Sequence, residues 1–350
     1  MTTRRTIERA ARAPANIHSV DVYLRQALAP NTVAAYQADI RHFRDWGGRI
    51  PATPQMVARY MAAHADRVKP GTLRRRMAAI AAAHTLLHRP SPTRSELVQA
   101  TFRGIRRVHG TAQRQAKPLS LETLRKLARP RKDLEPMRDL RDRVLLVVGF
   151  AGGFRRSELA RLTPLDLSFT PQGVEVVLRR SKTDQHGKGR VVALPVGPRP
   201  MCPVMLLKEW LTVLKREDPT GPANPLFRSV DRYGQLGKSL RGAAVGTILR
   251  QRLNLCGLER AGFSAHSLRS GLVTAAAEAG VPTWQIQRQT GHRSESTVHR
   301  YIRGLSLFDQ NAFAGANAVC LTADEVISDA TSPRRSTKRL SQPSGRRAYA

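Results

Sequence analysis

Cysteine is scarce in this chain. Only three of its 350 residues are cysteines, and Cys202, Cys256 and Cys320 are widely separated. No Cys-x-x-Cys pair occurs, so the sequence predicts neither a disulfide framework nor a zinc site with paired cysteine ligands. Few, unpaired cysteines are typical of a reducing compartment, and we therefore expect a cytoplasmic location.

Long apolar runs are also lacking. The longest, residues 144–153, is far too short to cross a bilayer, and no apolar run follows the basic start of the chain. We therefore expect neither a membrane span nor a signal peptide. No amphipathic stretch carries a strongly apolar face of Trp, Phe and Leu, which disfavours the alternative of a basic membrane-surface protein.

Acidic residues are few, and basic residues are abundant. Against 26 acidic residues stand 59 lysines and arginines, a formal net charge of +33 spread over the whole length. A compact protein with this charge repels itself unless a polyanion is its normal partner. Nucleic acid is the first candidate, because neutralised phosphates release their counterions. A hydrophobic fraction of 41% can still support a folded core, and the length suits about two domains.

The pattern of apolar and polar residues divides the chain into five segments. Residues 1–17 read as a basic arm and 18–110 as an all-α domain of about five helices. A polar linker at 111–118 leads to a second domain at 119–320, and the basic tail at 321–350 is expected to be disordered.

Capping residues and periodicity locate the expected elements. In the first domain, the first helix is expected at 19–28, where a break at Pro30-Asn31 ends it, and Asn31 or Thr32 can cap the second. Thr53 caps the third, residues 69–72 start the fourth, and Thr93 or Ser95 can cap the fifth. In the second domain, we expect helices near 121–128, 140–149, 155–162, 204–214, 238–255, 267–279, 282–290, 294–301 and 309–318. Three short strands are expected at 165–169, 173–178 and 190–194.

Two helices of the first domain are rich in arginine. These residues are Arg74, Arg75 and Arg76 on the fourth helix, expected to face outward, and Arg103, Arg106 and Arg107 on the fifth. One interpretation is a solvated, charged surface. The other, which we favour, is contact with DNA phosphates or the major groove.

Arg155, Glu158 and Lys182 are the first candidates for chemistry. Arg155 follows a glycine-rich break and precedes a helix, where Glu158, one turn on, can orient its guanidinium. The alternative is an ordinary surface ion pair. Lys182, in a Ser-Lys-Thr loop between two strands, can donate a proton to a leaving alkoxide. Lys188 in the same loop is an alternative, and a solvated loop lysine is another.

A second cluster lies near the carboxyl end. His266 and Arg269 are three residues apart and share one helix face, His292 follows a Thr-Gly break, and Tyr301 lies between two nearby arginines. Guanidinium and imidazole groups can hold the non-bridging oxygens of a phosphodiester, and a phenol can attack its phosphorus. A single tyrosine is usually a packing residue, but packing does not explain these four in this order.

Taken in order, these motifs resemble those of tyrosine recombinases, the family of phage-integrase and Cre-type site-specific recombinases. The resemblance in motifs covers about residues 119–318, whereas the helical domain at 18–109 matches by position and type only. It implies a mainly α fold with a small antiparallel β-sheet. The implied domains are an N-terminal all-α core-binding (SAM-like) domain and an α+β integrase-type catalytic domain.

The resemblance also assigns roles. It implies that Tyr301 attacks the scissile phosphate and forms a 3′-phosphotyrosyl bond. Arg155 and Arg269 are implied to clamp the non-bridging oxygens, assisted by His266 and His292. The resemblance further implies that Lys182 is the general acid and that Glu158 supports Arg155. No cofactor is implied, because fixed guanidinium groups stabilise the charge that develops on the phosphate and the tyrosyl link conserves the bond energy.

We therefore expect a site-specific DNA recombinase for integration, excision or resolution. By resemblance, four identical protomers act on two double-stranded DNA sites, linked by a segment near 305–318, in a bacterial or phage context close to the nucleoid. One alternative is a type IB topoisomerase, which shares the chemistry but relaxes DNA without a specific site. The size of the helical domain disfavours it. The other is an inactive basic DNA-binding protein, which the complete set of motif residues disfavours.

Overall fold

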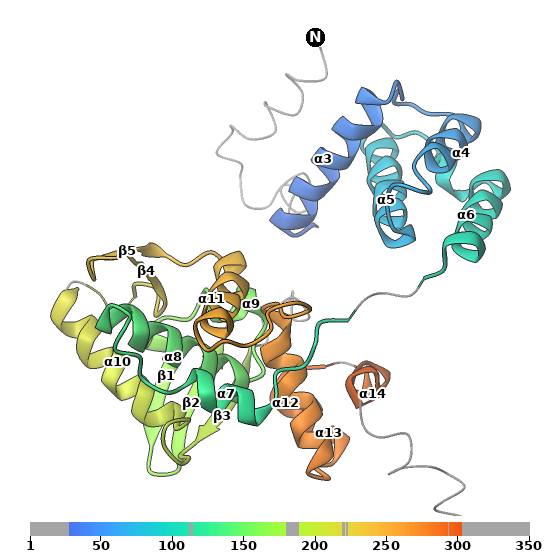
Figure 1. Cartoon of the computed structure of the whole chain (residues 1–350). Helices are drawn as coiled ribbons and strands as arrows, with labels where there is room; N and C mark the ends of the chain where they lie inside the picture. Colours follow the sequence, from blue (N-terminus) through green and yellow to red (C-terminus); the bar gives the residue numbers. More distant parts are fainter. Residues whose placement is uncertain are drawn as a thin grey trace, which may run out of the picture. The chain divides into compact units, whose positions relative to one another are not determined.

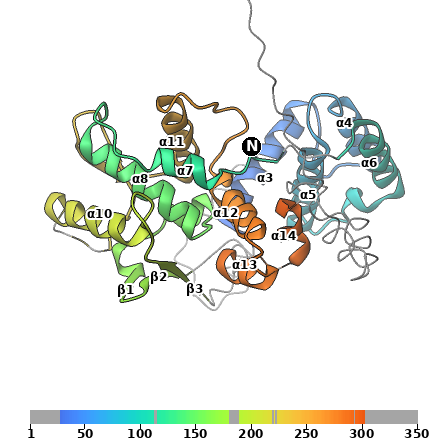
Figure 2. The same ribbon diagram turned by 60° about the horizontal axis from the view of Figure 1, so that its bottom comes forward.

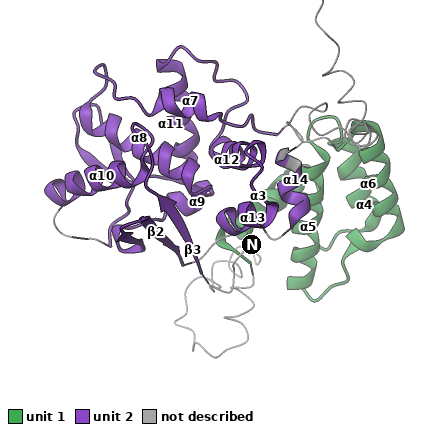
Figure 3. Cartoon of the chain, turned by 90° about the horizontal axis from the view of Figure 1, so that it is seen from below, with its two compact units in different colours: residues 1–114 green, residues 115–350 purple. Residues whose placement is uncertain are grey.

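The computed structural model of the chain divides into two compact units, Met1–Arg114 and Gln115–Ala350 (Figure 1, Figure 3). The structure describes residues 28–111, 115–179, 189–218, 221, 223–292 and 294–302. The basic arm expected at 1–17, nearly all of the helix expected at 19–28, the helix expected at 309–318 and the tail at 321–350 lie outside these residues.

The described part of unit 1 is helical. Its elements are α3 (Pro30–Asp45), α4 (Pro54–Ala63), α5 (Pro70–Leu86), the short 3₁₀ turn η1 (Pro92–Arg94) and α6 (Glu96–His109). The side chain of Thr53 caps α4 and that of Ser95 caps α6, both as predicted. The predicted cap of this helix, Asn31 or Thr32, is wrong, because Ala29 is the N-cap residue. Pro30 is the first residue of α3, where the missing N–H costs no helical hydrogen bond.

Arg76 faces the core of unit 1. The prediction that Arg74, Arg75 and Arg76 all face outward is wrong for Arg76, which is only 8% exposed. Helical spacing places it on one face with buried Leu73 and Ile80, and its Nε lies 3.9 Å from Oδ1 of Asp39 on α3. Its guanidinium lies 5.7 Å from the centroid of the Tyr60 ring. Arg76 therefore belongs to the packing of unit 1, and we no longer count it among the candidate DNA contacts.

Unit 2 is built around one buried helix. Its elements before the second hairpin are α7 (Leu121–Leu127), α8 (Pro136–Ala151), α9 (Arg156–Leu159), η2 (Pro164–Asp166), β1 (Leu167–Thr170), β2 (Gly173–Leu178), β3 (Arg190–Pro195) and α10 (Pro203–Glu217). From residue 139 to 150 every side chain of α8 is buried, and α7, α10 and α12 pack against this helix (Figure 1). The three strands form an antiparallel sheet in the order β1-β2-β3.

A short hairpin follows α10, where the sequence predicted the start of a helix. β4 (Arg228–Val230) pairs with β5 (Leu236–Ser239), and α11 begins only at Gly242 and ends at Leu255. The predicted helix at 238–255 is therefore too long at its start. The Asp231 carboxylate accepts hydrogen bonds from two backbone N–H groups of the turn, and Gly234 there has a φ of +83°. These bonds form the turn that joins the two strands, and Arg228 pairs with Ser239, so residues 238 and 239 belong to β5 and not to the helix.

The last three described helices form a small group of their own. α12 (His266–Glu278), α13 (Thr283–Thr290) and α14 (Glu295–Ile302) pack around Val273, Ile286 and Val298 (Figure 2). α13 ends at Thr290, and the next residue, Gly291, has a φ of +68°, a left-handed conformation that reverses the chain. Among the described helices, none is both long and apolar enough to cross a membrane.

Arg252 joins three helices of unit 2 and is fully buried. From α11 it forms an ion pair with Asp139 of α8. Its Nη2 donates to the carbonyl oxygens of Leu127 (2.6 Å) and Arg129 (3.1 Å), at the end of α7. A buried guanidinium with these partners fixes how α7, α8 and α11 sit together, and removing it leaves a buried carboxylate short of one partner.

We expect Arg252→Ala to lower the free energy of unfolding of unit 2 by roughly 3–5 kcal/mol. The exposed ion pair of Arg216 with Glu217 offers a matched control, and Arg216→Ala should cost less than about 1 kcal/mol. Urea unfolding followed by tryptophan fluorescence measures both, because Trp210 is buried in this unit. Equal effects of the two substitutions would contradict a structural role for Arg252.

Candidate active site

The C-terminus of α13 gathers three guanidinium groups. Three consecutive backbone carbonyl oxygens each accept a hydrogen bond from one arginine: Gln289 from Arg190 Nη1 (2.6 Å), Thr290 from Arg269 Nη1 (2.5 Å) and Gly291 from Arg155 Nη2 (3.4 Å). The last carbonyls of a helix lack helical partners and carry the negative end of its dipole. They therefore attract cations from β3, α12 and the start of α9 to one place.

Glu158 is the carboxylate of this cluster. Its Oε1 lies 2.6 Å from Arg155 Nη1, and its Oε2 accepts from the Arg155 backbone N–H at 2.9 Å. The same Oε2 lies 3.4 Å from Arg190 Nη2. Within the part of the chain that the structure describes, no other carboxylate pairs with the three arginines. The cluster therefore holds an excess of positive charge.

Arg269 is the most buried of the three arginines, only 1% exposed. Its Nη1 also donates to the Gly153 carbonyl oxygen at 2.7 Å. Its Nη2 is buried and has no hydrogen-bond partner among the described residues. Burial, and then the charge of Arg155, lower the pKa of Arg269 to about 9. A buried donor without a partner is costly, so this site is suited to an anion that supplies acceptor oxygens.

Tyr301 lies beside this cluster. Its hydroxyl is 2.6 Å from His266 Nε2, which joins α14 to α12. Although part of His266 is open to solvent, loss of surrounding water and then the charges of Arg269 and Arg155 lower the pKa of its imidazole. A neutral imidazole at this distance can accept the phenolic proton and increase the nucleophilicity of the oxygen.

His292 lies on the other side of the same tyrosine. Its ring centroid is 5.6 Å from that of Tyr301, and its Nδ1 is 2.8 Å from Thr290 Oγ1. Burial, followed by the charges of Arg269 and Arg155, lowers the pKa of His292 to about 3. Without an anion the ring is therefore neutral at physiological pH, and a bound anion raises its pKa.

The structure brings six of the residues singled out in the sequence into one region: Arg155, Glu158, His266, Arg269, His292 and Tyr301. The two candidate general acids, Lys182 and Lys188, lie in 180–188, outside the described residues. No group of three or more His, Cys, Asp or Glu side chains in the described ranges is arranged to hold a metal ion.

The arginines predicted to bind DNA belong to unit 1 and differ in their surroundings. Arg75 makes two hydrogen bonds of 2.8 Å with Asp39, and Arg103 pairs with Glu96. The remaining exposed arginines, Arg74, Arg106 and Arg107, have no carboxylate partner within the described part of the chain. Among the predicted contacts, these three are the residues whose charge is most available to a phosphate.

Sequence reasoning missed Arg190 and the role of Thr290. Arg190 was assigned only as the first residue of a strand. An arginine leading the apolar run Val-Val-Ala-Leu, directly after the loop with Lys182, was the available signal. Burial lowers the pKa of Arg190, the charge of Glu158 raises it and the charge of Arg155 lowers it, with a lowered pKa as the result. Arg190 therefore interacts with the charges of the same cluster.

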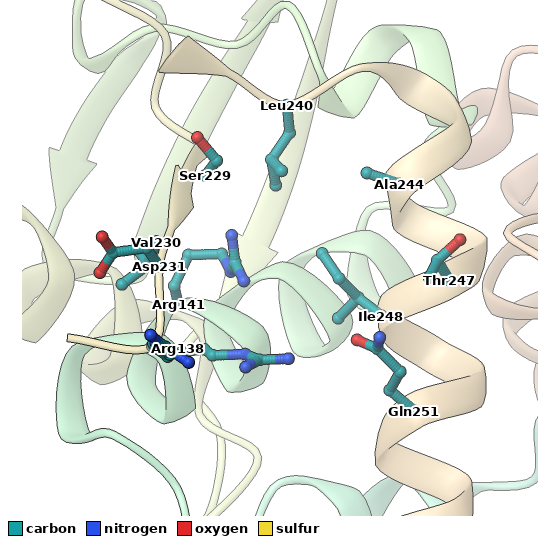
Figure 4. Close-up of a pocket in the computed structure, with 11 residues that line it drawn as sticks. Arg138, Arg141, Ser229, Val230, Asp231, Leu240, Ala244, Thr247, Ile248 and Gln251 are labelled. Atoms are coloured by element: carbon teal, nitrogen blue, oxygen red, sulfur yellow. The ribbon is translucent and has the colours of Figure 1, made fainter. Parts of the chain in front are cut away.

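A separate cavity of about 290 Å³ lies between the β4–β5 hairpin and α11. Figure 4 shows Arg138 and Arg141 beside Ile248 and Gln251 in this cavity. None of the clustered site residues lines it. The chemistry described here is therefore placed at the end of α13 and not in this cavity.

The lowered pKa of His292 makes a measurable contribution to stability. The unfolded histidine takes up its proton near pH 6.5 and the folded one near 3, so the fold loses stability as the pH falls below about 6.5. We expect His292→Gln to remove this loss. Between about pH 6.5 and 5, the free energy of unfolding of the variant should therefore rise relative to that of wild type by up to about 2 kcal/mol.

Urea unfolding of both proteins across this pH range measures the difference. His299 is exposed on α14 beside Glu295, and His299→Gln is the matched control for the substitution itself. If wild type and His292→Gln lose stability in parallel on acidification, the pKa of His292 is not lowered as described.

Comparison with known proteins shows the family of the chain. Residues 119–306 match the model of the phage integrase family. The chain is 38% identical over 299 residues to an integrase/recombinase xerD homolog of Selenomonas ruminantium, covering 83% of this chain and 86% of that protein.

Two solved structures share the fold. XerH site-specific recombinase, bound to a palindromic difH substrate, matches with a TM-score of 0.56 and 19% identity over 83% of this chain and 79% of that one. A lambda integrase tetramer bound to a Holliday junction matches with a TM-score of 0.53 and 16% identity over 78% and 72%. The family match covers the arginine cluster and its tyrosine, and the chain belongs to the phage integrase family of tyrosine recombinases.

Proposed function

We propose that this chain is a site-specific DNA recombinase that cuts and rejoins strands through a phosphotyrosyl intermediate. The observation that carries the proposal is the position of Tyr301, hydrogen bonded to His266 beside three guanidinium groups, of which only those of Arg155 and Arg190 pair with a carboxylate. A phosphodiester is the anion that this set suits, because it offers two non-bridging oxygens to the arginines and a phosphorus to the phenol.

In the first step, the Tyr301 oxygen attacks the scissile phosphorus and the bond to the 5′-oxygen breaks. His266 Nε2 accepts the phenolic proton, and the leaving 5′-oxygen takes a proton from Lys182 as the general acid. Arg155 and Arg269 stabilise the charge that grows on the non-bridging oxygens, and fixed donors in a site with little water do this most effectively. A 5′-hydroxyl of a second strand then reverses the step and releases the tyrosine, so no external energy source is needed.

Double-stranded DNA is the proposed partner. The net charge of +33 favours binding to a polyanion, and exposed Arg74, Arg106 and Arg107 of unit 1 are proposed to contact phosphates. Exchange between two duplexes requires four strand cuts, and each protomer carries one tyrosine of this kind. Four identical protomers on two sites are therefore the proposed assembly, as in the lambda integrase tetramer on a Holliday junction.

Tyr301→Phe should abolish covalent attachment to DNA, because phenylalanine has no oxygen to attack phosphorus. The measurement uses duplex DNA nicked beside the cleavage point, which traps the covalent complex on a denaturing gel. Tyr233 is exposed on the β4–β5 turn, and Tyr233→Phe should behave as wild type. A covalent complex formed by Tyr301→Phe would exclude Tyr301 as the nucleophile.

A recombination assay with two sites, run beside relaxation of a supercoiled plasmid without a site, separates this function from that of a type IB topoisomerase. The recombinase should exchange strands between its sites and leave the plasmid unrelaxed. Relaxation without exchange would favour the topoisomerase.

Each phosphate contact in unit 1 contributes to the salt dependence of DNA binding. We expect Arg74→Ala, Arg106→Ala and Arg107→Ala each to reduce the slope of log K against log salt concentration by about 1. Arg59 is exposed on α4 but is not among the predicted contacts, so Arg59→Ala is the control. Fluorescence anisotropy at several salt concentrations gives the slopes, and unchanged slopes for all three variants would exclude these three arginines from the interface.

A further inference from the structure

Thr290 is the last residue of α13 and is fully buried. Its hydroxyl oxygen lies 2.6 Å from the Ile286 carbonyl oxygen and 2.8 Å from His292 Nδ1. Its backbone carbonyl accepts the hydrogen bond from Arg269 described above. One residue therefore touches both a guanidinium and an imidazole of the site without itself being placed to meet a substrate.

The two contacts of the hydroxyl determine where the protons lie. A carbonyl oxygen has no proton to donate, so the single hydroxyl proton of Thr290 must point to Ile286. The hydroxyl oxygen can then only accept from His292 Nδ1, and Nδ1 must carry the proton. In the neutral imidazole this leaves Nε2 as an unprotonated acceptor.

We propose that Thr290 is a positioning residue that selects the tautomer of His292, so that Nε2 is the atom that gains a proton when an anion occupies the site. Without the hydroxyl, both tautomers of a neutral ring are available. With it, His292 Nε2 cannot donate until the ring is protonated. His292 then becomes a hydrogen-bond donor to a phosphate oxygen only in the loaded site.

The charges that face His292 favour this behaviour. They come from every element packed around it: Arg155 at the start of α9, Arg190 of β3, His266 and Arg269 of α12, with Glu158 beside Arg155 and the Tyr301 phenol on α14. The four basic groups oppose a proton on the ring while the site is empty. A bound phosphodiester adds negative charge among them and removes part of that opposition.

The methyl group of Thr290 has a different role, which allows the two to be separated. A Cβ placed on Gly153 would lie 2.9 Å from this methyl carbon, so the methyl packs against the chain at Gly153. Thr290→Val keeps a branched apolar side chain and loses the hydroxyl. Thr290→Ser keeps the hydroxyl and loses the methyl group. The proposal predicts that serine preserves the tautomer and valine does not.

The tautomer is measured on the free full-length protein by NMR of ¹⁵N-labelled histidine, with His292→Gln assigning the signal. Wild type and Thr290→Ser should show a protonated Nδ1 and an unprotonated Nε2, and Thr290→Val should show a mixture. A proton on Nε2 in wild type, or an unchanged tautomer in Thr290→Val, overturns the proposal. If Thr290→Val does not fold, Thr290→Ala takes its place, since it also lacks the hydroxyl but introduces no extra bulk.

The functional consequence rests on the proposed recombinase activity and is tested with the nicked DNA. We expect Thr290→Val to form the covalent complex roughly 10-fold more slowly and with an altered pH profile, because a hydrogen bond that orients a reacting group is lost. Thr290→Ser should restore both rate and profile. If Thr290→Ser, which lacks the methyl group, is slow while Thr290→Val reacts at the wild-type rate, the proposal is overturned. Failure of wild type to form any complex would refute the proposed function, whereas the NMR result on tautomer selection stands apart from it.

Discussion

Repulsion among three guanidinium groups is the constraint around which unit 2 is arranged. Arg155, Arg190 and Arg269 are brought together although they repel one another, and the pKa of Arg269 falls to about 9 as burial and this repulsion act on it. Three carbonyl oxygens at the end of α13 and the carboxylate of Glu158 hold them in place. These partners offset only part of the repulsion among the three positive charges, so binding of an anion reduces the repulsion that remains.

Backbone geometry makes this assembly possible at two glycines. Gly291 has a φ of +68°, and a side chain there would approach the Arg190 guanidinium to about 3.0 Å. Gly153 has a φ of +56°, and its carbonyl oxygen holds Arg269. Both positions combine a conformation that L-residues rarely adopt with close packing. The helices behind them are fixed by α8 and by Arg252, so the positions of the three cations follow from the packing of the core.

The motif residues could be recognised in the sequence because each short motif has a local pattern, whereas their grouping into one site was implied by the family resemblance. Helical spacing placed His266 and Arg269 on one face, and the Thr-Gly break correctly indicated where α13 ends. Arg76, Arg190 and Arg252 could not be read in this way. An arginine in a helix or strand pattern looks like a surface residue, and only partners distant in the sequence, such as Asp139 for Arg252, make its burial favourable. The β4–β5 hairpin was not predicted because its strands, Arg-Ser-Val and Leu-Gly-Lys-Ser, contain only one β-branched residue, Val230.

The basic residues also differ in how strongly salt affects their charges, depending on whether they are exposed or buried. Exposed arginines such as Arg74 and Arg106 have charges that salt screens over about 10 Å at moderate ionic strength. Arg269 is shielded from solvent, and its hydrogen bonds to carbonyl oxygens do not depend on mobile ions. Salt therefore acts mainly on how tightly the chain holds DNA, and much less on the geometry that the arginine cluster offers to a phosphate already in place. On the proposed function, the net charge of +33 thus comprises exposed arginines that would contact DNA and buried arginines that would hold the reacting phosphate.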